Sequence, residues 1–318
     1  MESSMNIYIL APENHKSGGA ELSHQFCNAV NRVTDVKAYM CYASVEKPYP
    51  MTMDSPAPEA YRIYNTEHAT SLEEIDRQEN VVVFPEGLTL SMLHIKKARK
   101  AMWWMSVDNY LKSTDGDSLA YLRDNVEFHL YQSYYAKDYI DKNLPNSKSI
   151  YVSDYINEQH GQFIFPAQYR QNIALYNPAK GYEDIKPLIE KASWLKWIPI
   201  INLDVSKIVL LLQSGKIYVD FGNHPGKDRI PREAASDGCC VITNRKGAAA
   251  FEGDVPIPED YKFEDPAASL DEIDALLHDI CDNFEAHQKH FEGYREMIRG
   301  EKAKFDKDVA AFVSMIKG

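Results

Sequence analysis

Short, continuous runs of apolar residues recur along this chain and alternate with segments of helical periodicity, and no other feature restricts the fold as strongly. Residues 81–84 are four apolar residues in succession. After the first such run, Leu22, Phe26 and Val30 recur at helical spacing. Strands that are apolar throughout are typical of a parallel sheet whose two faces are covered by helices. The sequence therefore predicts an α/β fold built on parallel sheets.

This alternation occurs twice. The first half contains predicted strands at residues 5–10, 81–84, 101–105, 127–132 and 149–152, and the second half at residues 172–176, 195–200, 216–221 and 239–243. A chain of 318 residues has room for two domains that each bury a core of their own. We therefore predict two Rossmann-like domains.

The boundary between the predicted domains falls where the periodicity fades, between Asp154 and Pro166. We place the first domain at residues 1–158 and the second at residues 159–282. Residues 283–318 contain no proline and are typical of helix, so we expect a C-terminal helical segment that packs across both domains.

Composition narrows the function classes. The net charge is −12, and so acidic a chain is unsuited to wrapping nucleic acid, so we expect no nucleic-acid partner. The five cysteines show no metal-ligand spacing, and their odd number suggests a reducing compartment. No secretory signal is seen, and no stretch approaches the ~20 apolar residues of a membrane-spanning helix. We expect a cytoplasmic protein that is soluble or, at most, peripheral at the inner face of a membrane.

The loop after the first predicted strand carries two adjacent glycines, Gly18 and Gly19, just before a helix. Glycines at this place let the backbone approach a ligand and leave the helix N-terminal N–H groups open to an anion. An ordinary tight turn is the alternative interpretation. The GxGxxG pattern of a dinucleotide site is absent, which disfavours a dehydrogenase.

Two loops of the second half also have a composition that suits a phosphate. Asn177 and Lys180 follow the first strand of this half, where ligands of open α/β sheets bind and where a lysine can meet a diphosphate. Gly247 follows the strand at 239–243 and leads into small residues. Both segments are also common turn sequences, so neither is diagnostic alone.

The most informative segment is residues 220–238, in which a strand ends at a loop that holds His224, Lys227 and Arg229. A helix follows, with a proline suited to its start and Glu233 in its first turn. Helix capping explains the proline and the closing glycine. It does not explain a concentration of ionisable groups at the end of a strand, so we predict a ligand site here.

The order of these motifs resembles the GT-B glycosyltransferases, particularly the large retaining group that makes bacterial surface polysaccharides. The resemblance covers nearly the whole chain: GGAE after the first strand, NPAKG after the first strand of the second half, then PREA, SDG, an apolar strand and GAA. It implies transfer of a sugar from a nucleotide-sugar donor to a glycan or lipid-linked acceptor. It also implies retention of the anomeric configuration without a metal or other cofactor.

The resemblance assigns roles to single positions. Glu233 matches the second glutamate of the family signature, which contacts the nucleotide ribose, and Gly226 matches the glycine after the first glutamate. Lys180 matches the lysine that neutralises the donor diphosphate. Gly18 and Gly19 match the glycine loop that faces the donor and the acceptor.

Two positions depart from the family pattern. Pro225 stands where the first glutamate is expected, and Leu175 stands where an arginine usually precedes the lysine. We expect His224 to supply a polar contact instead, and Arg229 or Lys227 to supply the missing positive charge.

The end of the strand at 101–105 adds an acceptor-side candidate, Asp108, which is placed to act as a base. The neighbouring Trp103 and Trp104 either line the acceptor cleft or belong to a buried core. We predict that no metal takes part and that catalysis depends on Lys180, Arg229 and Asp108. The predicted donor-binding residues are Gly18, Gly19, Asn177, His224, Gly226, Lys227, Glu233 and Gly247.

Several alternatives stay open at this point. Asp115-Gly116-Asp117 is a DxD sequence, the metal-binding signature of the other large glycosyltransferase fold, but its polar loop favours a solvated turn. If the reaction inverts the anomeric centre, a base is needed, and Asp108, His15 or Glu86 would supply it. A non-catalytic nucleotide-sugar-binding protein and a sugar-nucleotide epimerase of the same fold are the rival functions.

Overall fold

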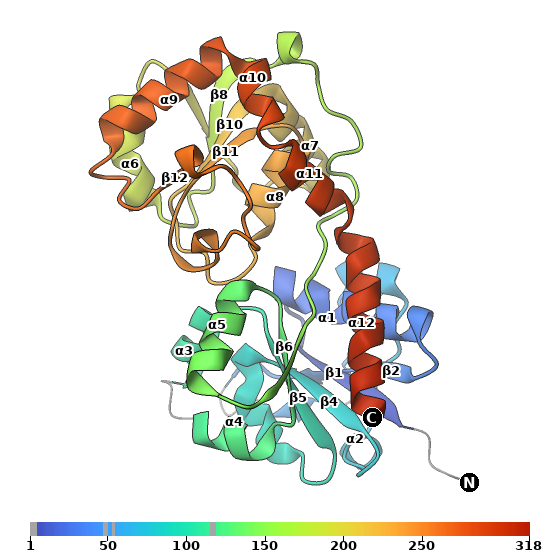
Figure 1. Ribbon diagram of the computed structural model, residues 1–318. Helices are drawn as coiled ribbons and strands as arrows, with labels where there is room; N and C mark the ends of the chain where they lie inside the picture. Colours follow the sequence, from blue (N-terminus) through green and yellow to red (C-terminus); the bar gives the residue numbers. More distant parts are fainter. Residues whose placement is uncertain (1–4, 47–49, 53–54, 115–118) are drawn as a thin grey trace. The chain divides into compact units, whose positions relative to one another are not determined.

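The computed structural model describes residues 5–46, 50–52, 55–114 and 119–318 and contains two compact units (Figure 1). Unit 1 comprises residues 1–154 and 303–318, and unit 2 comprises residues 155–302. The chain thus leaves unit 1 after Asp154 and returns to it after Lys302. Each unit has a sheet and a core of its own.

Unit 1 is built on a seven-stranded sheet in the order β3-β2-β1-β4-β5-β6-β7. All neighbouring strands pair in parallel except β3, which is antiparallel to β2. The strands are β1 (Asn6–Pro12), β2 (Lys37–Ala43), β3 (Met51–Thr52), β4 (Val81–Pro85), β5 (Arg99–Trp104), β6 (Phe128–Tyr131) and β7 (Lys148–Tyr151).

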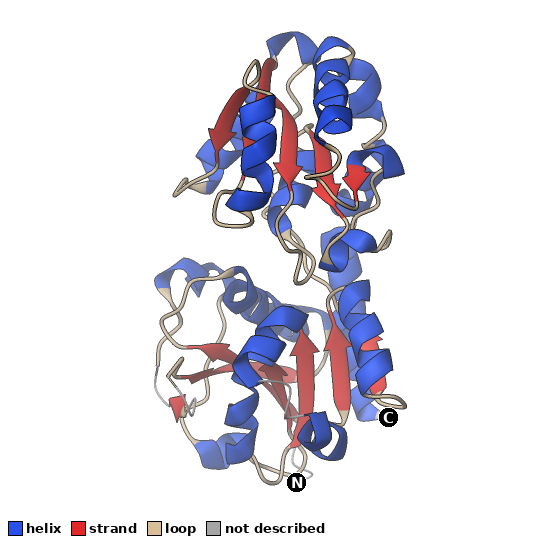
Figure 2. Ribbon diagram, turned by 90° about the vertical axis from the view of Figure 1, so that its left-hand side faces the viewer, coloured by secondary structure: helices blue, strands red, loops and turns tan. Residues whose placement is uncertain are grey.

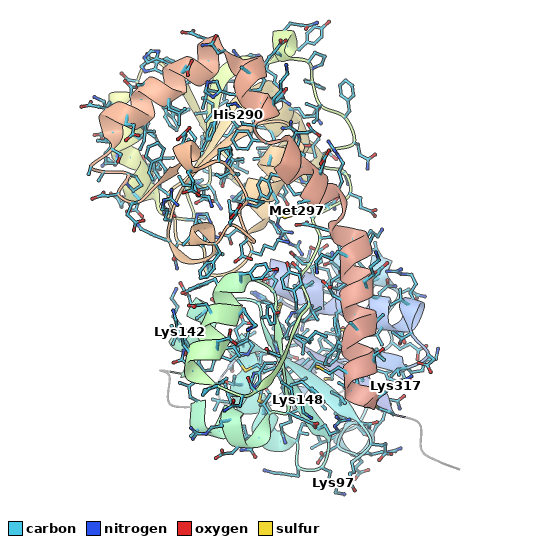
Figure 3. The ribbon with its side chains drawn as sticks, in the orientation of Figure 1. Lys97, Lys142, Lys148, His290, Met297 and Lys317 are labelled. Atoms are coloured by element: carbon cyan, nitrogen blue, oxygen red, sulfur yellow. The ribbon has the colours of Figure 1, made fainter. Side chains whose placement is uncertain are left out.

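Helices cover the sheet of unit 1. On one face, the Phe26 ring lies 5.0 Å from Trp103 and 5.8 Å from Phe312, which packs the last helix beside the first. Charged side chains such as Lys142 and Lys317 lie on the outside (Figure 3). The helices are α1 (Gly18–Val33), α2 (Leu72–Ile75), α3 (Val107–Thr114), α4 (Leu119–Asn125), α5 (Tyr134–Asn143), most of α12 (Glu301–Lys317) and the 3-10 helices η1 (Glu59–Tyr64) and η2 (Glu86–His94).

Unit 2 has a five-stranded, fully parallel sheet in the order β12-β11-β10-β8-β9, flanked by helices on both faces (Figure 2). Its strands are β8 (Gln171–Tyr176), β9 (Lys196–Pro199), β10 (Gly215–Asp220), β11 (Cys240–Asn244) and β12 (Lys262–Phe263). Its helices are α6 (Tyr182–Lys191), α7 (Val205–Ser214), α8 (Arg229–Ser236), α9 (Leu270–Asp282), α10 (Phe284–Lys289), α11 (Glu292–Arg299) and the 3-10 helices η3 (Ala167–Tyr169), η4 (Gly247–Ala250) and η5 (Glu259–Tyr261).

The predicted α/β class with two parallel-sheet domains and C-terminal helices is confirmed. The units divide at Asp154, whereas the sequence placed the boundary after residue 158. The segment 283–318, expected to be one helical piece, is shared: Phe291 and Tyr294 are buried in the core of unit 2, while Phe312 is buried in unit 1. The apolar residues of each part therefore decide which core it joins.

Each sheet has one point at which the strand order reverses. In unit 1 this point lies between β1 and β4, since β2 continues on the other side of β1. In unit 2 it lies between β8 and β10, with β9 on the other side of β8. Ligands of open α/β sheets bind outside the carboxyl ends of the strands at such switch points. Ligand sites are therefore expected at the loops after β1 and β4 and at those after β8 and β10.

Candidate functional site

Three loops of unit 2 meet at the carboxyl edge of its sheet, and together they form what we call the loop cluster (residues 177–181, 221–228 and 245–247). A Cβ atom on Gly181, whose φ is +63°, would lie 2.6 Å from Gly222 Cα. A Cβ atom on Gly247, whose φ is +55°, would lie 2.0 Å from the His224 carbonyl oxygen, which accepts a hydrogen bond from Ala248 N–H at 2.8 Å. These glycines are needed because the loops approach each other backbone to backbone.

Helix α8 begins directly at the loop cluster. Asp228 is its N-cap residue, but the Asp228 side chain makes no capping hydrogen bond. Arg229 is the first helical residue, and Pro231 lacks an N–H that would otherwise need a partner. The N-terminus of α8, where the helix dipole favours an anion, therefore lies at the loop cluster.

A chain of alternating charges runs through the loop cluster. Lys180 Nζ lies 2.6 Å from Asp228 Oδ1. The other oxygen, Asp228 Oδ2, lies 3.0 Å from His224 Nδ1, an ion pair whose alignment falls short of a hydrogen bond. His224 Nε2 in turn lies 3.8 Å from Asp220 Oδ1, and the hydroxyl of Tyr218 donates to Asp220 Oδ2 at 3.0 Å. Lys180 is one-third exposed, whereas His224 is buried.

The His224 ring lies between two carboxylates, each of which faces a different ring nitrogen. Burial by itself lowers the pKa of His224, but contact with Asp228 and the charge of Asp220 raise it above its ordinary value. Burial raises the pKa of Asp228, but the cations His224 and Lys180 lower it below its ordinary value. The imidazolium form suits this arrangement, because it donates a proton toward each carboxylate.

Within the described residues, Asp220, His224 and Asp228 are also the set of side chains that can approach a metal ion together, with ligand atoms within 4.8 Å of one another. A single metal ion needs ligand atoms that converge. Here the two carboxylates face opposite nitrogens of one ring, and Asp228 already holds the Lys180 ammonium. The geometry fits an internal imidazolium better than a metal centre.

Lys227 of the loop cluster belongs to a second group of charges, which is buried. Glu301, at the start of α12, contacts Lys227 Nζ at 2.8 Å and Arg232 Nη1 at 2.8 Å. The Lys227 and Arg232 side chains are 4% and 0% exposed. The sequence predicted Lys227 as a donor-binding residue, but in the structure its ammonium group faces Glu301.

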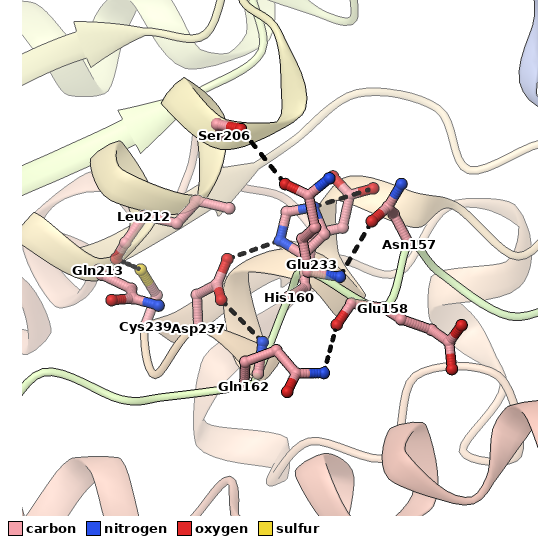
Figure 4. A network of polar contacts seen from close by, with 12 residues as sticks. Asn157, Glu158, His160, Gln162, Ser206, Leu212, Gln213, Glu233, Asp237 and Cys239 are labelled. Atoms are coloured by element: carbon pink, nitrogen blue, oxygen red, sulfur yellow. Dashed lines mark hydrogen bonds and ion pairs between the residues drawn. The ribbon is translucent and has the colours of Figure 1, made fainter. Parts of the chain in front are cut away.

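Glu233 lies in a polar network that joins α8 to the segment following Tyr155 (Figure 4). His160 Nδ1 lies 2.6 Å from Asp237 Oδ2, and His160 Nε2 lies 3.8 Å from Glu233 Oε1. Burial raises the pKa of Glu233 above its ordinary value, although His160 and Arg229 counteract this. The predicted ribose-contacting residue is thus half-buried against a histidine that the sequence did not single out.

The remaining predicted residues of unit 2 shape the loops. Asn177 Oδ1 accepts a hydrogen bond from Ala179 N–H at 3.0 Å and so builds the turn that carries Lys180. Gly226 is buried in the loop after β10. Leu175, which stands where the family has an arginine, is buried in β8.

In unit 1, the two glycines that the sequence placed in a loop before the helix are the first two residues of α1 itself. The Ser17 side chain caps α1 by accepting a hydrogen bond from Ala20 N–H, and the Ser17 backbone N–H donates to the Tyr61 hydroxyl at 2.9 Å. Gly18 is exposed, and a Cβ atom on Gly19 would meet only Met105, at an ordinary 3.7 Å. The packing around Gly19 therefore does not require a glycine.

Glu86 directly follows β4 and is buried. Its Oε2 accepts a hydrogen bond from Met105 N–H at 3.1 Å, and Ser106 N–H and the Asn109 side chain also donate to this carboxyl group. Burial raises the pKa of Glu86 to about 7, even though these hydrogen bonds oppose the shift. Glu86 therefore lies under the loop after β5, which carries Asp108.

Asp108 is half-buried in the first turn of α3, where Tyr135 Oη donates to its Oδ1 at 3.3 Å. His15 is exposed in the loop after β1. Trp103 and Trp104 are fully buried, and their indole N–H groups donate within the core, so they belong to the core alternative. The DxD sequence at 115–117 lies outside the described residues.

No protein-family model matches the chain, and no curated protein matches it significantly. Solved structures do match it over nearly its whole length. They include sucrose-phosphate synthase from Thermosynechococcus elongatus, with a TM-score of 0.65, 11% identity and 99% of each chain covered. Anabaena HepE in complex with UDP has a TM-score of 0.67 at 10% identity, covering 98% of this chain and 100% of that one.

A glycosyltransferase from Rickettsia africae completes the comparison, with a TM-score of 0.66, 13% identity, and 100% and 98% of the two chains covered. The chain has the GT-B fold. At these identities the likeness establishes the arrangement of sheets and helices, as expected from the motif order. Within the described residues, no helix has the length and apolar character needed to span a membrane.

Proposed function

We propose that this protein is a glycosyltransferase that moves a sugar from a nucleotide-sugar donor to a glycan or lipid-linked acceptor. The observation that carries the proposal is the loop cluster of unit 2, where Lys180 and the N-terminus of α8 meet at the β8/β10 switch point. A flexible cation beside the N-terminus of a helix is the chemistry that a diphosphate requires.

Lys180, Arg229 and the first turn of α8 stabilise the departing diphosphate in this proposal, without a metal ion. Glu233, the fifth residue of the same helix, meets the ribose in this proposal. Anabaena HepE was solved with UDP and with UDP-glucose, so uridine diphosphate sugars are the first donors to test. The resemblance to the retaining group favours retention of the anomeric configuration.

Unit 1 binds the acceptor in this proposal, at the switch point between β1 and β4. Gly19 leaves room there for close approach, Gly18 is exposed beside it, and Asp108 supplies a polar group. The acceptor class, a glycan or lipid-linked sugar of surface polysaccharide synthesis, follows from the resemblance. A lipid-linked acceptor would bring the protein to the surface of a membrane.

A thermal-shift screen against UDP-, GDP-, dTDP- and CMP-sugars tests donor binding, because a ligand that binds the folded state raises its apparent stability. We expect a shift with at least one donor, and a loss of that shift in Lys180→Ala. Lys289→Ala, an exposed lysine on α10, is the matched control and should keep it. No shift with any donor would contradict the proposal.

The replacement of the first family glutamate by Pro225 favours one rival, a non-catalytic protein that binds nucleotide sugars. An epimerase is the other. Incubation with the binding donor separates them: a transferase forms product only with an acceptor, an epimerase converts the donor without one, and a binding protein leaves it intact.

A further inference from the structure

The carboxylate of Asp228 is shared by two cations that differ in their access to a ligand. Lys180 holds Oδ1 at 2.6 Å and is 35% exposed, whereas His224 faces Oδ2 at 3.0 Å and is 1% exposed. Only Lys180 can turn toward a bound diphosphate. Doing so removes it from Asp228, a carboxylate whose side chain is itself only 15% exposed.

We propose that His224 is a positioning residue: its buried imidazolium balances Asp228 when Lys180 turns from that carboxylate to the diphosphate of the donor. This inference rests on the proposed function of the loop cluster and specifies how its lysine is released. His224 itself touches neither the donor nor the reacting atoms.

The surroundings of His224 support this role. Asp220 faces it from the end of β10, Asp228 from the N-cap of α8, and Lys180 from the loop after β8. The loop after β11 contributes backbone, since Ala248 N–H donates to the His224 carbonyl oxygen. If the His224 imidazole were neutral, Lys180 would be the cation that balances Asp228 in this chain of charges. Departure of Lys180 would then leave the nearly buried Asp228 carboxylate without that balance, which is strongly unfavourable. A charged imidazole removes that penalty.

The sign of the pH dependence follows from this arrangement. The pKa of His224 is raised above its ordinary value, with Asp228 and Asp220 outweighing burial. Donor affinity is therefore fully present at low pH and declines as the pH rises through the pKa of His224. A nucleoside diphosphate sugar has no terminal phosphate that titrates near neutrality, so the donor itself adds no such dependence.

The test measures the dissociation constant of the tightest-binding nucleoside diphosphate sugar from the thermal-shift screen, by calorimetry between about pH 6 and 8.5. We expect the wild type to bind about tenfold more weakly at the upper end, and His224→Asn to bind about tenfold more weakly at pH 6 with a flat profile. A flat profile for the wild type would overturn the inference.

A double-mutant cycle separates positioning from a merely structural role. In the Asp228→Asn background no carboxylate holds Lys180, so adding His224→Asn should not weaken binding further. Loss of Asp228 removes no helix cap, because its side chain makes no capping bond. An equal loss in both backgrounds, with all variants folded by circular dichroism, would overturn the inference and leave the proposed function intact. Failure of the wild type to bind any donor would overturn the proposed function, and the inference with it.

Discussion

Glu86 in unit 1 and Asp228 in unit 2 are carboxyl groups at the switch points of their two sheets, yet their surroundings are opposite. The hydrogen-bond donors of Glu86 include the backbone N–H groups of Met105 and Ser106, and burial raises its pKa to about 7. Asp228 lies between Lys180 and His224, which lower its pKa. The same topology therefore carries a carboxyl group surrounded by neutral donors in one unit and a carboxylate between two cations in the other.

Sheet topology therefore determines where a ligand binds, but it does not determine which kind of ligand binds there. Unit 2 concentrates cations and a helix N-terminus, which suit a diphosphate. Unit 1 offers small residues and a carboxyl group among neutral donors, which suit the hydroxyl groups of an acceptor. Four measurements test how far the contrast extends.

The largest expected effect concerns buried charge in unit 2. Glu301→Ala removes the carboxylate that Lys227 and Arg232 share in the interior. We expect the free energy of unfolding to fall by about 3–5 kcal/mol, because two buried cations lose their common counter-ion. Denaturant unfolding followed by circular dichroism measures this free energy. A decrease below about 1 kcal/mol would contradict the prediction, because ion pairs exposed to solvent contribute that little.

Glu86→Gln tests the carboxyl group of unit 1. The pKa of Glu86 is raised from 4.5 to about 7 by folding, so the wild type should lose stability as the pH rises between these values. The loss should amount to about 2–3 kcal/mol. The variant should lack this part of the pH dependence and be the more stable protein at pH 8. Identical stability profiles from pH 5 to 8, by denaturant unfolding, would contradict the assignment.

Matched glycine substitutions compare the two switch points, at Gly247 in the loop cluster of unit 2 and at Gly19 in the first turn of α1 in unit 1. Gly247→Ala in unit 2 places a Cβ atom against the His224 carbonyl oxygen at a positive φ, and we expect it to cost about 1–3 kcal/mol and to weaken donor binding. Gly19→Ala in unit 1 meets only Met105 at 3.7 Å and should not destabilise the fold. Thermal unfolding of both variants checks this, and equal melting temperatures would remove the contrast in packing.

The smallest effect is expected for exposed charge in unit 1. Asp306→Asn removes the ion pair between α12 and Arg32, whose side chain is 45% exposed. Such pairs contribute no more than about 1 kcal/mol, and less at high salt. Denaturant unfolding measures this effect, as for Glu301→Ala. A decrease in unfolding free energy as large as in Glu301→Ala would show that the difference in solvent exposure does not determine how much each ion pair contributes.

The architecture of the two units could be predicted from local sequence signals. Continuous apolar runs, helical spacing and turn residues are local signals, and every strand predicted from them is present in the structure. The sequence also predicted that residues 177–181 and 221–228 are loops that directly follow strands, because each comes after an apolar run. The strand at Lys37–Ala43 was not predicted, since its lysine and tyrosines weaken the apolar signal that marks the others.

The pairing of the charged side chains could be read only from the folded chain. Lys227 and Glu301 are 74 positions apart, and His160 reaches Asp237 across 77 positions; no local pattern connects either pair. Within the loop after β10, Asp228 takes its role from Lys180, which arrives from another strand. Charge pairing depends on which residues come close together in the folded chain. Contacts between residues far apart in the sequence produce no periodic pattern from which they could be predicted.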